Sequence, residues 1–281
     1  MDLLNPPRLD KRIVKKRFNR AAKSYDNAAI LQEEVLSRLL QRLQYMRHQP
    51  ETIVDIGCAT GKAIRGLQKQ YPRARVNACE IAFDMLLQAR SRHRLLSRKR
   101  LVNADMEQLP FAGQSFDLVF SSQALQWSND LRATLAEFAR VCRPGALLLF
   151  STLGPATLQE LAHSWDALDE YPHVHQFIDM HDVGDVMLAS GFAQPVVDAE
   201  IIRLEYSDFG ALLADLKNSG ASNADVGRRR GLMTPRQLQR LEQSYRQHGF
   251  EDGKFIASYE VVYGHAWYDQ ALAQEPGGST P

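Results

Sequence analysis

The sequence predicts an α/β fold in which a mostly parallel, seven-stranded sheet carries helices on both faces. Between residues 52 and 151, short apolar runs alternate with helical patterns, which is typical of the strand–helix–strand units that build parallel sheets. Hydrophobic residues make up 44% of the 281 positions and charged residues 24%, so the chain can bury a sizeable core.

The elements follow in a regular order. Two helices come first, at 9–24 and 28–46, and the second repeats apolar residues at helical spacing. Strands are then expected at 52–56, 75–80, 101–105, 116–122 and 146–151. Helices separate them at 61–71, from Phe83 onward and at 130–142. After Ser151 the regular alternation of strands and helices ends. Helices are then expected at 156–169, 181–190, 208–217 and 235–248, and strands at 196–206 and 255–263.

This pattern divides the chain into five parts. We expect an N-terminal helical lid segment at 1–46, a ligand-binding core at 47–207, a helical lid insertion at 208–250, the last core strand at 251–267 and a disordered tail at 268–281.

Composition excludes several classes of protein. The net charge of +1 gives no reason to expect nucleic-acid binding, and no apolar run approaches the roughly 20 residues that span a bilayer. The first residues lack the apolar centre of a signal peptide. Three cysteines without a CxxC pair predict no disulfide framework and no metal site, so we expect a cytoplasmic protein. Basic stretches at 8–23, 90–100 and 228–230 favour an acidic partner.

The segment VDIGCATG, residues 54–61, predicts a nucleotide-type loop after the first strand. Gly57 and Gly61 allow a ligand to approach the backbone closely, and a helix begins just beyond them. The pattern GxGxxG, which serves a diphosphate, is incomplete because Ala59 stands where a further glycine is expected. The loop therefore suits an amino-acid carboxylate better than a diphosphate.

Polar residues at the other strand ends indicate what completes the ligand. Ligands of open parallel sheets bind beyond the carboxyl ends of the strands. Glu80 follows Gly61 by nineteen residues, and its carboxylate can accept hydrogen bonds from both hydroxyls of a ribose. Asp105 can accept from an adenine amine while the backbone of Met106 donates to a ring nitrogen. Ribose, adenine and an amino-acid tail together describe S-adenosylmethionine.

Four ordered segments now resemble a known family. VDIGCATGKAIRGL, VNACEIAFDMLLQAR, NADMEQLPFAGQSFDLVFSSQALQW and ARVCRPGALLLFST are similar to the class I S-adenosylmethionine-dependent methyltransferases, over about residues 50–152. The resemblance implies the Rossmann-like fold of that family and S-adenosyl-L-methionine as cofactor, with S-adenosylhomocysteine as product. The cofactor residues that it implies are Asp55, Gly57, Gly61, Glu80, Ile81, Asp105, Met106 and Ser122. Ala59 departs from the glycine of the family, and we expect it to be tolerated.

The rest of the chain resembles one subfamily, the malonyl-acyl-carrier-protein O-methyltransferases of biotin synthesis. The segments that carry this resemblance are FNRAAKSYDNAAILQEEV, TLQELAHSWDALDEYPHVHQFIDMHDVGDVMLASGF, LLADLKNSGASN and YEVVYGHAW. It implies methyl transfer to the free carboxylate of a malonyl thioester, and an acidic acyl carrier protein as partner.

A carboxylate is ionised at neutral pH, so we expect no essential general base. Histidines gather between 163 and 181, and packing or capping roles are favoured for them. For the malonyl group, Arg228 is the first choice of counter-ion, because its planar fork holds a carboxylate in one geometry. Tyr25 and Trp127 are the other expected substrate-binding residues. Arg228–Arg230 and the helix at 11–23 are candidates for docking the carrier protein.

Four alternatives stay open at this point. The same segments resemble a respiratory-complex assembly factor of this fold that hydroxylates an arginine. The chain could also methylate another small carboxylate, such as a tricarboxylic acid. A nicotinamide-dependent oxidoreductase is disfavoured by the missing GxGxxG, and a non-catalytic cofactor-binding scaffold would be excluded by turnover.

Overall fold

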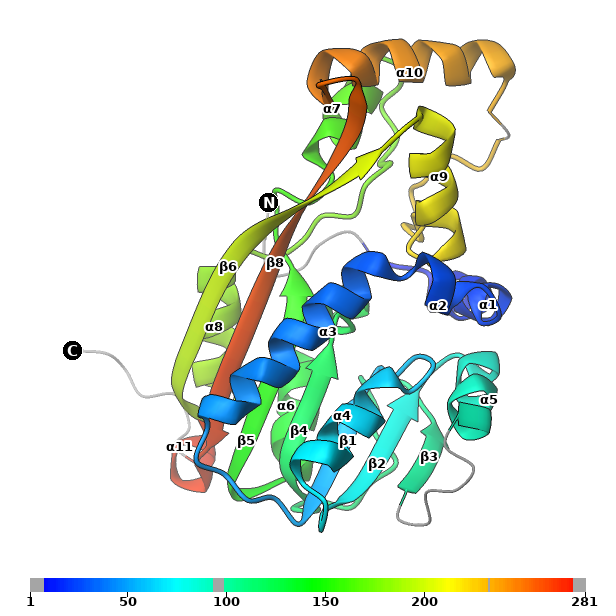
Figure 1. The fold of residues 1–281 in the computed structure, drawn as a ribbon. Coiled ribbons are helices and arrows are strands. Elements are labelled where there is room, and N and C mark those ends of the chain that lie inside the picture. Colours follow the sequence, from blue (N-terminus) through cyan, green and yellow to red (C-terminus); the bar gives the residue numbers. More distant parts are fainter. Residues whose placement is uncertain (1–7, 93–98, 232, 275–281) are drawn as a thin grey trace, which may run out of the picture.

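The computed structural model describes residues 8–92, 99–231 and 233–274. Its centre is an eight-stranded sheet in the order β3-β2-β1-β4-β5-β8-β6, with β7 paired to β8 (Figure 1). The strands are β1 (Thr52–Ile56), β2 (Arg75–Glu80), β3 (Lys99–Asn103), β4 (Phe116–Ser122), β5 (Cys142–Leu153), β6 (Phe192–Tyr206), β7 (Phe250–Glu251) and β8 (Lys254–Tyr268).

Helices precede, separate and follow the strands. The α-helices are α1 (Lys11–Ala21), α2 (Tyr25–Ala28), α3 (Ile30–Arg42), α4 (Lys62–Gln70), α5 (Phe83–Arg92), α6 (Leu131–Val141), α7 (Gln159–Asp166), α8 (Met180–Ala189), α9 (Phe209–Asn218), α10 (Pro235–His248) and α11 (Gln270–Gln274). Short 3-10 turns lie at η1 (Leu43–Tyr45) and η2 (Leu125–Trp127). None of the described helices is long and apolar enough to cross a membrane.

Strands β1 to β5 pair in parallel, and β8 inserts antiparallel between β5 and β6. The reversal of strand order on either side of β1 creates a crevice beyond the carboxyl ends of β1 and β4, which is where ligands of such sheets bind. The topology thus brings together loops that are up to about seventy residues apart in the sequence.

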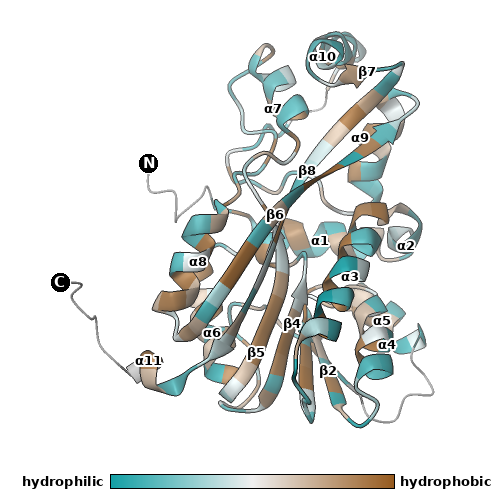
Figure 2. Cartoon of the chain, turned by 60° about the vertical axis from the view of Figure 1, so that its left-hand side comes forward, coloured by the Kyte–Doolittle hydropathy of each residue, from teal (hydrophilic) through white to brown (hydrophobic). Residues whose placement is uncertain are grey.

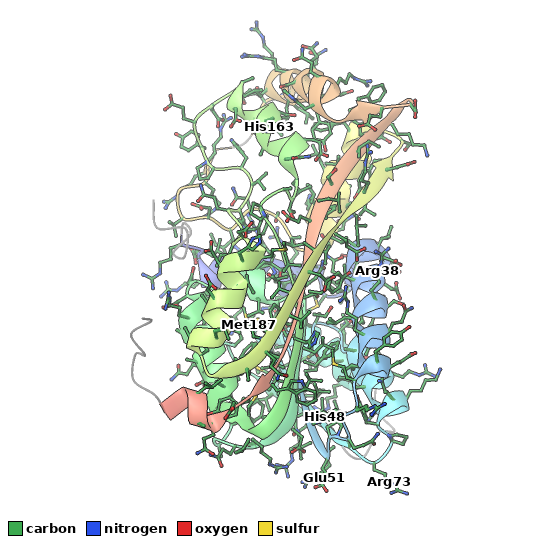
Figure 3. All side chains as sticks on the ribbon, turned by 90° about the vertical axis from the view of Figure 1, so that its left-hand side faces the viewer. Arg38, His48, Glu51, Arg73, His163 and Met187 are labelled. Carbon is green, nitrogen blue, oxygen red and sulfur yellow. The ribbon has the colours of Figure 1, made fainter. Side chains whose placement is uncertain are left out.

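Alternate residues of the central strands enter two separate cores, since successive side chains of a strand point to opposite faces. Ile53 and Leu149 pack with α3 and α4, whereas Val54 and Leu148 pack with α6 and α8. Met187 of α8 is fully buried in the second core (Figure 3). Figure 2 shows hydrophobic residues running along both β4 and β5 between these helical layers.

Strands β6 and β8 continue well past the other strands and carry α7, α9 and α10 beyond the sheet (Figure 1). Thr234 and Gln237 form a capping box at the start of α10, and Tyr245 on that helix is fully buried. Its ring packs against Phe209 of α9 and Phe255 of β8. The buried residues of α9 and α10 therefore continue the core that contains Ile53 and Leu149 along the extended strands.

Helix α3 is also tied to β6 by charged groups. Arg42 donates two hydrogen bonds, of 2.7 and 2.6 Å, to Asp198, and Arg38 pairs with Glu200 (Figure 3). Paired, planar contacts of this kind hold one geometry better than single exposed ion pairs. The N-terminal segment is thus anchored to the outermost strand of the sheet.

The expected elements need several corrections. The sheet has eight strands rather than seven, because Phe250–Glu251 folds back on β8 as β7. The third strand covers 99–103 rather than 101–105, so Asp105 lies in the loop after it. Residues 268–274, expected as disordered tail, end β8 and form α11. Residues 275–281, 1–7 and the centre of the basic stretch at 90–100 lie outside the described residues.

Candidate active site

The carboxyl ends of β1, β2 and β4 open into a cleft that is also lined by residues of the N-terminal helices and of the segment 215–221. Seven of the eight expected cofactor residues line it, namely Asp55, Gly57, Glu80, Ile81, Asp105, Met106 and Ser122. The eighth, Gly61, is not in the lining and has a positive φ of 77° at the start of α4.

The loop after β1 is fixed to the end of β2. The backbone N–H groups of Gly57 and Cys58 both donate to the carbonyl of Cys79, at 2.8 and 3.0 Å. Gly57 has a φ of 75°, and a Cβ there would lie 2.2 Å from the Cβ of Ala124. Only glycine therefore fits at this point, where the loop after β1 passes the loop after β4.

Ala59 adopts a left-handed conformation, with a φ of 45°. This conformation costs an L-residue roughly 1–2 kcal/mol. Its N–H donates to Glu80 Oε2 at 3.0 Å, while Ala82 donates to Oε1 at 2.8 Å. The carboxylate of Glu80 thus holds the strained loop and lines the cleft at the same time.

Asp55 is a buried acid of the cleft with an uncompensated carboxylate oxygen. It is 1% exposed, and its Oδ2 has no hydrogen-bond partner. Burial raises the pKa of Asp55 to about 8, and the neighbouring Glu80 carboxylate adds to the rise. A buried acceptor without a donor is costly, so this site suits a cationic ligand group such as an ammonium.

Two lysines line the cleft, and both are already paired. Lys11 of α1 lies 3.1 Å from Asp105 and 3.0 Å from Glu107. Lys62 of α4 lies 3.1 Å from Glu33. No arginine lines the cleft among residues 8–92, 99–231 and 233–274.

Aromatic rings also line the cleft. Phe18 of α1 packs edge-on against Trp127, with ring centroids 5.2 Å apart, and lies 6.5 Å from Tyr25. Trp127 also packs edge-on against His175 at 5.1 Å. Both expected aromatic substrate residues, Tyr25 and Trp127, therefore line the cleft.

His175 is the only histidine in the cleft lining within the described part of the chain. Its Nε2 accepts the N–H of Ala224 at 2.8 Å. Burial, aided by the charge of Arg17, lowers the pKa of His175 to about 4. The lone pair that a general base would use is thus occupied, and the imidazole is neutral at physiological pH.

Arg228, the expected counter-ion, does not line the cleft. Its guanidinium donates to the backbone carbonyl of Asp225 at 2.8 Å, because the loop after α9 turns the side chain back toward the backbone of that loop.

The loop after α9 also brings the basic segments together. Val226 donates to the carbonyl of Arg8 at 3.1 Å, and Arg17 of α1 bonds to the carbonyl of Asn223. Arg228–Arg230 and the basic helix α1 therefore lie side by side.

Three glutamines of the described residues line the cleft and were not anticipated: Gln32 of α3, and Gln123 and Gln126, which flank Ala124 and Leu125 in the turn after β4. Gln123 Nε2 and Gln126 Oε1 are buried without a hydrogen-bond partner. In the sequence they stand inside SSQALQW, beside the expected Ser122 and Trp127, but uncharged amides gave no signal of a binding role.

Fold and cleft define a class of protein, and the comparisons agree with it. Residues 54–150 match the family model described as a methyltransferase domain. The YcgJ protein of Bacillus subtilis has a similar fold, with a TM-score of 0.61 at 14% identity, covering 85% of this chain and 99% of that one. A methyltransferase of Bacillus halodurans gives a TM-score of 0.60 at 17% identity, covering 84% and 99%. The protein is an S-adenosyl-L-methionine-dependent methyltransferase with the class I, Rossmann-like fold.

Closer relatives narrow the class. The malonyl-[acyl-carrier protein] O-methyltransferase of Halorhodospira halophila is 46% identical over 260 residues, covering 92% of this chain and 88% of that protein. Its counterpart in Laribacter hongkongensis is 48% identical over 266 residues, covering 92% and 89%. The chain belongs to the malonyl-[acyl-carrier protein] O-methyltransferase family. These relatives do not favour the hydroxylase alternative.

Proposed function

We propose that this protein transfers the methyl group of S-adenosyl-L-methionine to the free carboxylate of a malonyl group on an acyl carrier protein, which gives the methyl ester used to prime pimeloyl and biotin synthesis. The observation that carries the proposal is the identity of 46–48% to relatives of that name over 92% of the chain. The cleft, which combines the carboxylates of Asp55, Glu80 and Asp105 with the rings of Tyr25 and Trp127, supports it.

The acidic residues that line the cleft fit the cofactor. Asp55 would accept from the ammonium of its methionine part, since Oδ2 is buried and without a donor. Glu80 would accept from the ribose, and Asp105 with the N–H of Met106 would hold the adenine beside Ile81. When bound, S-adenosyl-L-methionine supplies an electrophilic methyl group, whose carbon–sulfur bond breaks onto sulfur as the carboxylate oxygen bonds to carbon, with no proton transferred.

The chain itself contributes by binding the two reactants, aligning them and excluding water from the cleft. Holding two reactants in line can lower a barrier by roughly 7–11 kcal/mol, and the attacking carboxylate is ionised already. The neutral imidazole of His175, with its Nε2 occupied, supports a reaction without a general base. Helices α1 and α2 carry Phe18 and Tyr25 over the cleft, and we propose that residues 8–46 and 208–250 act as its lid.

The partner that we propose is an acidic carrier protein, which would dock on the basic surface formed by α1 and Arg228–Arg230. Opposite charges at the mouth of a cleft raise the rate of association and make it sensitive to salt. We also propose a cytoplasmic location, supported by three buried, free cysteines.

Mass spectrometry of malonyl-loaded acyl carrier protein tests the reaction directly. After incubation with enzyme and S-adenosyl-L-methionine, we expect the mass of one added methyl group, removed again by mild ester hydrolysis. A carrier of unchanged mass, with the cofactor shown to bind by calorimetry, would contradict the proposal.

A further inference from the structure

A carboxylate substrate meets an unusual environment in this cleft. The lining includes the acids Asp55, Glu80, Asp105 and Asp215, while its lysines are paired with other carboxylates. No arginine lines it in the described ranges. Neutral hydrogen-bond donors of the lining are therefore the candidates for holding the substrate's carboxylate.

Among the neutral residues of the lining, Gln123 and Gln126 each keep a buried side-chain polar atom without a hydrogen-bond partner. Gln123 is 8% exposed, lines the cleft, and has an Nε2 whose two N–H bonds find no acceptor. An unsatisfied buried polar atom costs about 1–3 kcal/mol, which is recovered when a ligand supplies the missing partner.

The backbone of Gln123 adopts a left-handed conformation that non-glycine residues disfavour. Its φ is 51°, a conformation that costs a non-glycine residue about 1–3 kcal/mol. The N–H of Gln123 donates to both the carbonyl and the Oγ of Ser151 on β5, each at 3.0 Å. The neighbouring strand thus maintains the strained turn that keeps this amide in the cleft.

Gln126 lies three residues further, in the turn η2, and its Oε1 is also buried without a donor. A carboxamide carries two N–H bonds beside its oxygen, and rotation about its last bond exchanges their positions. Gln123 can therefore donate as it stands and Gln126 after this rotation, and both residues line the same cleft as Trp127.

We propose that the side-chain amides of Gln123 and Gln126 form a neutral clamp that binds the free carboxylate of the acyl substrate. This inference rests on the proposed function and adds the residues that select a dicarboxylic acyl group. A neutral donor orients the carboxylate without cancelling its charge. The carboxylate thereby keeps its attraction to a sulfonium and its reactivity as a nucleophile.

A binding role of the two glutamines and a mere packing role predict different effects of substitution. Gln123→Leu and Gln126→Leu remove the donors, whereas Gln123→Glu and Gln126→Glu keep the shape and place a negative charge against the substrate. Glutamate should therefore be worse than leucine at either position. Gln114→Leu is the matched control, because Gln114 also has a positive φ, of 52°, and is exposed.

The experiment measures the affinity of the full-length enzyme for malonyl- and acetyl-loaded acyl carrier protein in the presence of S-adenosylhomocysteine, together with turnover. We expect the wild type and Gln114→Leu to prefer the malonyl form. The leucine variants should lose about 10- to 100-fold in malonyl affinity, the size of a hydrogen bond to a charged group, and leave acetyl binding unchanged. Unchanged affinity for S-adenosylhomocysteine shows that each variant folds.

Each outcome decides one of the two claims. Wild-type turnover with a malonyl preference that survives in every clamp variant would overturn the clamp and leave the function standing. Binding that prefers the malonyl form through these glutamines, without turnover, would support the clamp and overturn the function. A wild type that neither turns over nor distinguishes malonyl from acetyl would overturn both.

Discussion

Thr60 in the cofactor loop donates a hydrogen bond of 2.7 Å to Asp26 in α2, which links the N-terminal segment directly to the loop after β1. Asp26 also pairs with Arg92 of α5 and lies 3.9 Å from Lys62 of α4. Since the adjacent Tyr25 lines the cleft, this bond would couple closure of the proposed lid to the order of the loop.

Removing this link should loosen the proposed lid. Thr60→Val keeps the shape of a fully buried side chain but removes the hydroxyl, so we expect cofactor affinity to fall about fivefold, the equivalent of one hydrogen bond. Trypsin should cut faster among the basic residues of α1, and S-adenosylhomocysteine should protect less. Ser115→Ala, which removes a hydrogen bond of 2.7 Å to Ala112 outside the cleft, is the control. Equal cleavage of the two variants would argue against coupling.

Asp55→Asn should separate stability from binding. The pKa of Asp55 is about 8 in the folded protein and near 3.8 when unfolded, so the folded state holds a proton that the unfolded state releases. The wild type therefore loses stability as pH rises from about 4 to 8. Asparagine avoids this loss, so the unliganded variant should be more stable at pH 7.5 by a few kcal/mol and match the wild type near pH 4. Denaturant unfolding at both pH values measures this, and parallel curves would contradict it.

The same variant should bind cofactor at least tenfold more weakly, because it replaces a charged acceptor with a neutral amide. A cation bound at Asp55 favours its ionised form. Cofactor binding at pH 7 should therefore release a proton, so that the calorimetric heat varies with the ionisation enthalpy of the buffer. Heats independent of the buffer would show that Asp55 is not the group that contacts the cation.

Ala59→Gly should be tolerated and mildly stabilising. Glycine removes the cost of a φ of 45°, roughly 1–2 kcal/mol, and loses about 0.5–1 kcal/mol to the entropy of the unfolded chain. We expect up to about 1 kcal/mol of added stability by thermal unfolding, with unchanged cofactor affinity. A destabilised variant would mean that the alanine methyl contributes contacts exceeding the strain.

Reversing charge at Arg229 and Arg230 should weaken docking of the carrier protein. Glutamate at both positions should raise KM for malonyl-acyl carrier protein about tenfold while changing KM for malonyl-coenzyme A little, because only the protein meets the outer surface. Arg73, labelled in Figure 3, and Arg75 are exposed near the start of β2, at the end of that strand opposite the cleft, and serve as the control pair. Equal effects on both substrates would exclude a docking role.

Much of the proposed cofactor site could be predicted from the positions of acidic residues relative to the ends of the strands. Asp55, Glu80 and Asp105 each stand at or just after the end of a strand, and parallel strands bring such ends to one edge. Arg228 could not be placed in this way. Its position depends on a loop that packs on residues 8–17, more than two hundred positions away in the sequence.

The sequence by itself determined the fold class, the cofactor and the family, because these depend on local periodicity and on motifs at strand ends. Tertiary structure alone decided how β8 inserts between β5 and β6, where residues 208–248 pack, and which polar atoms are left without partners. Gln123 and Gln126 become significant only through burial. Burial and hydrogen-bond satisfaction depend on contacts between distant segments, which neither composition nor spacing specifies.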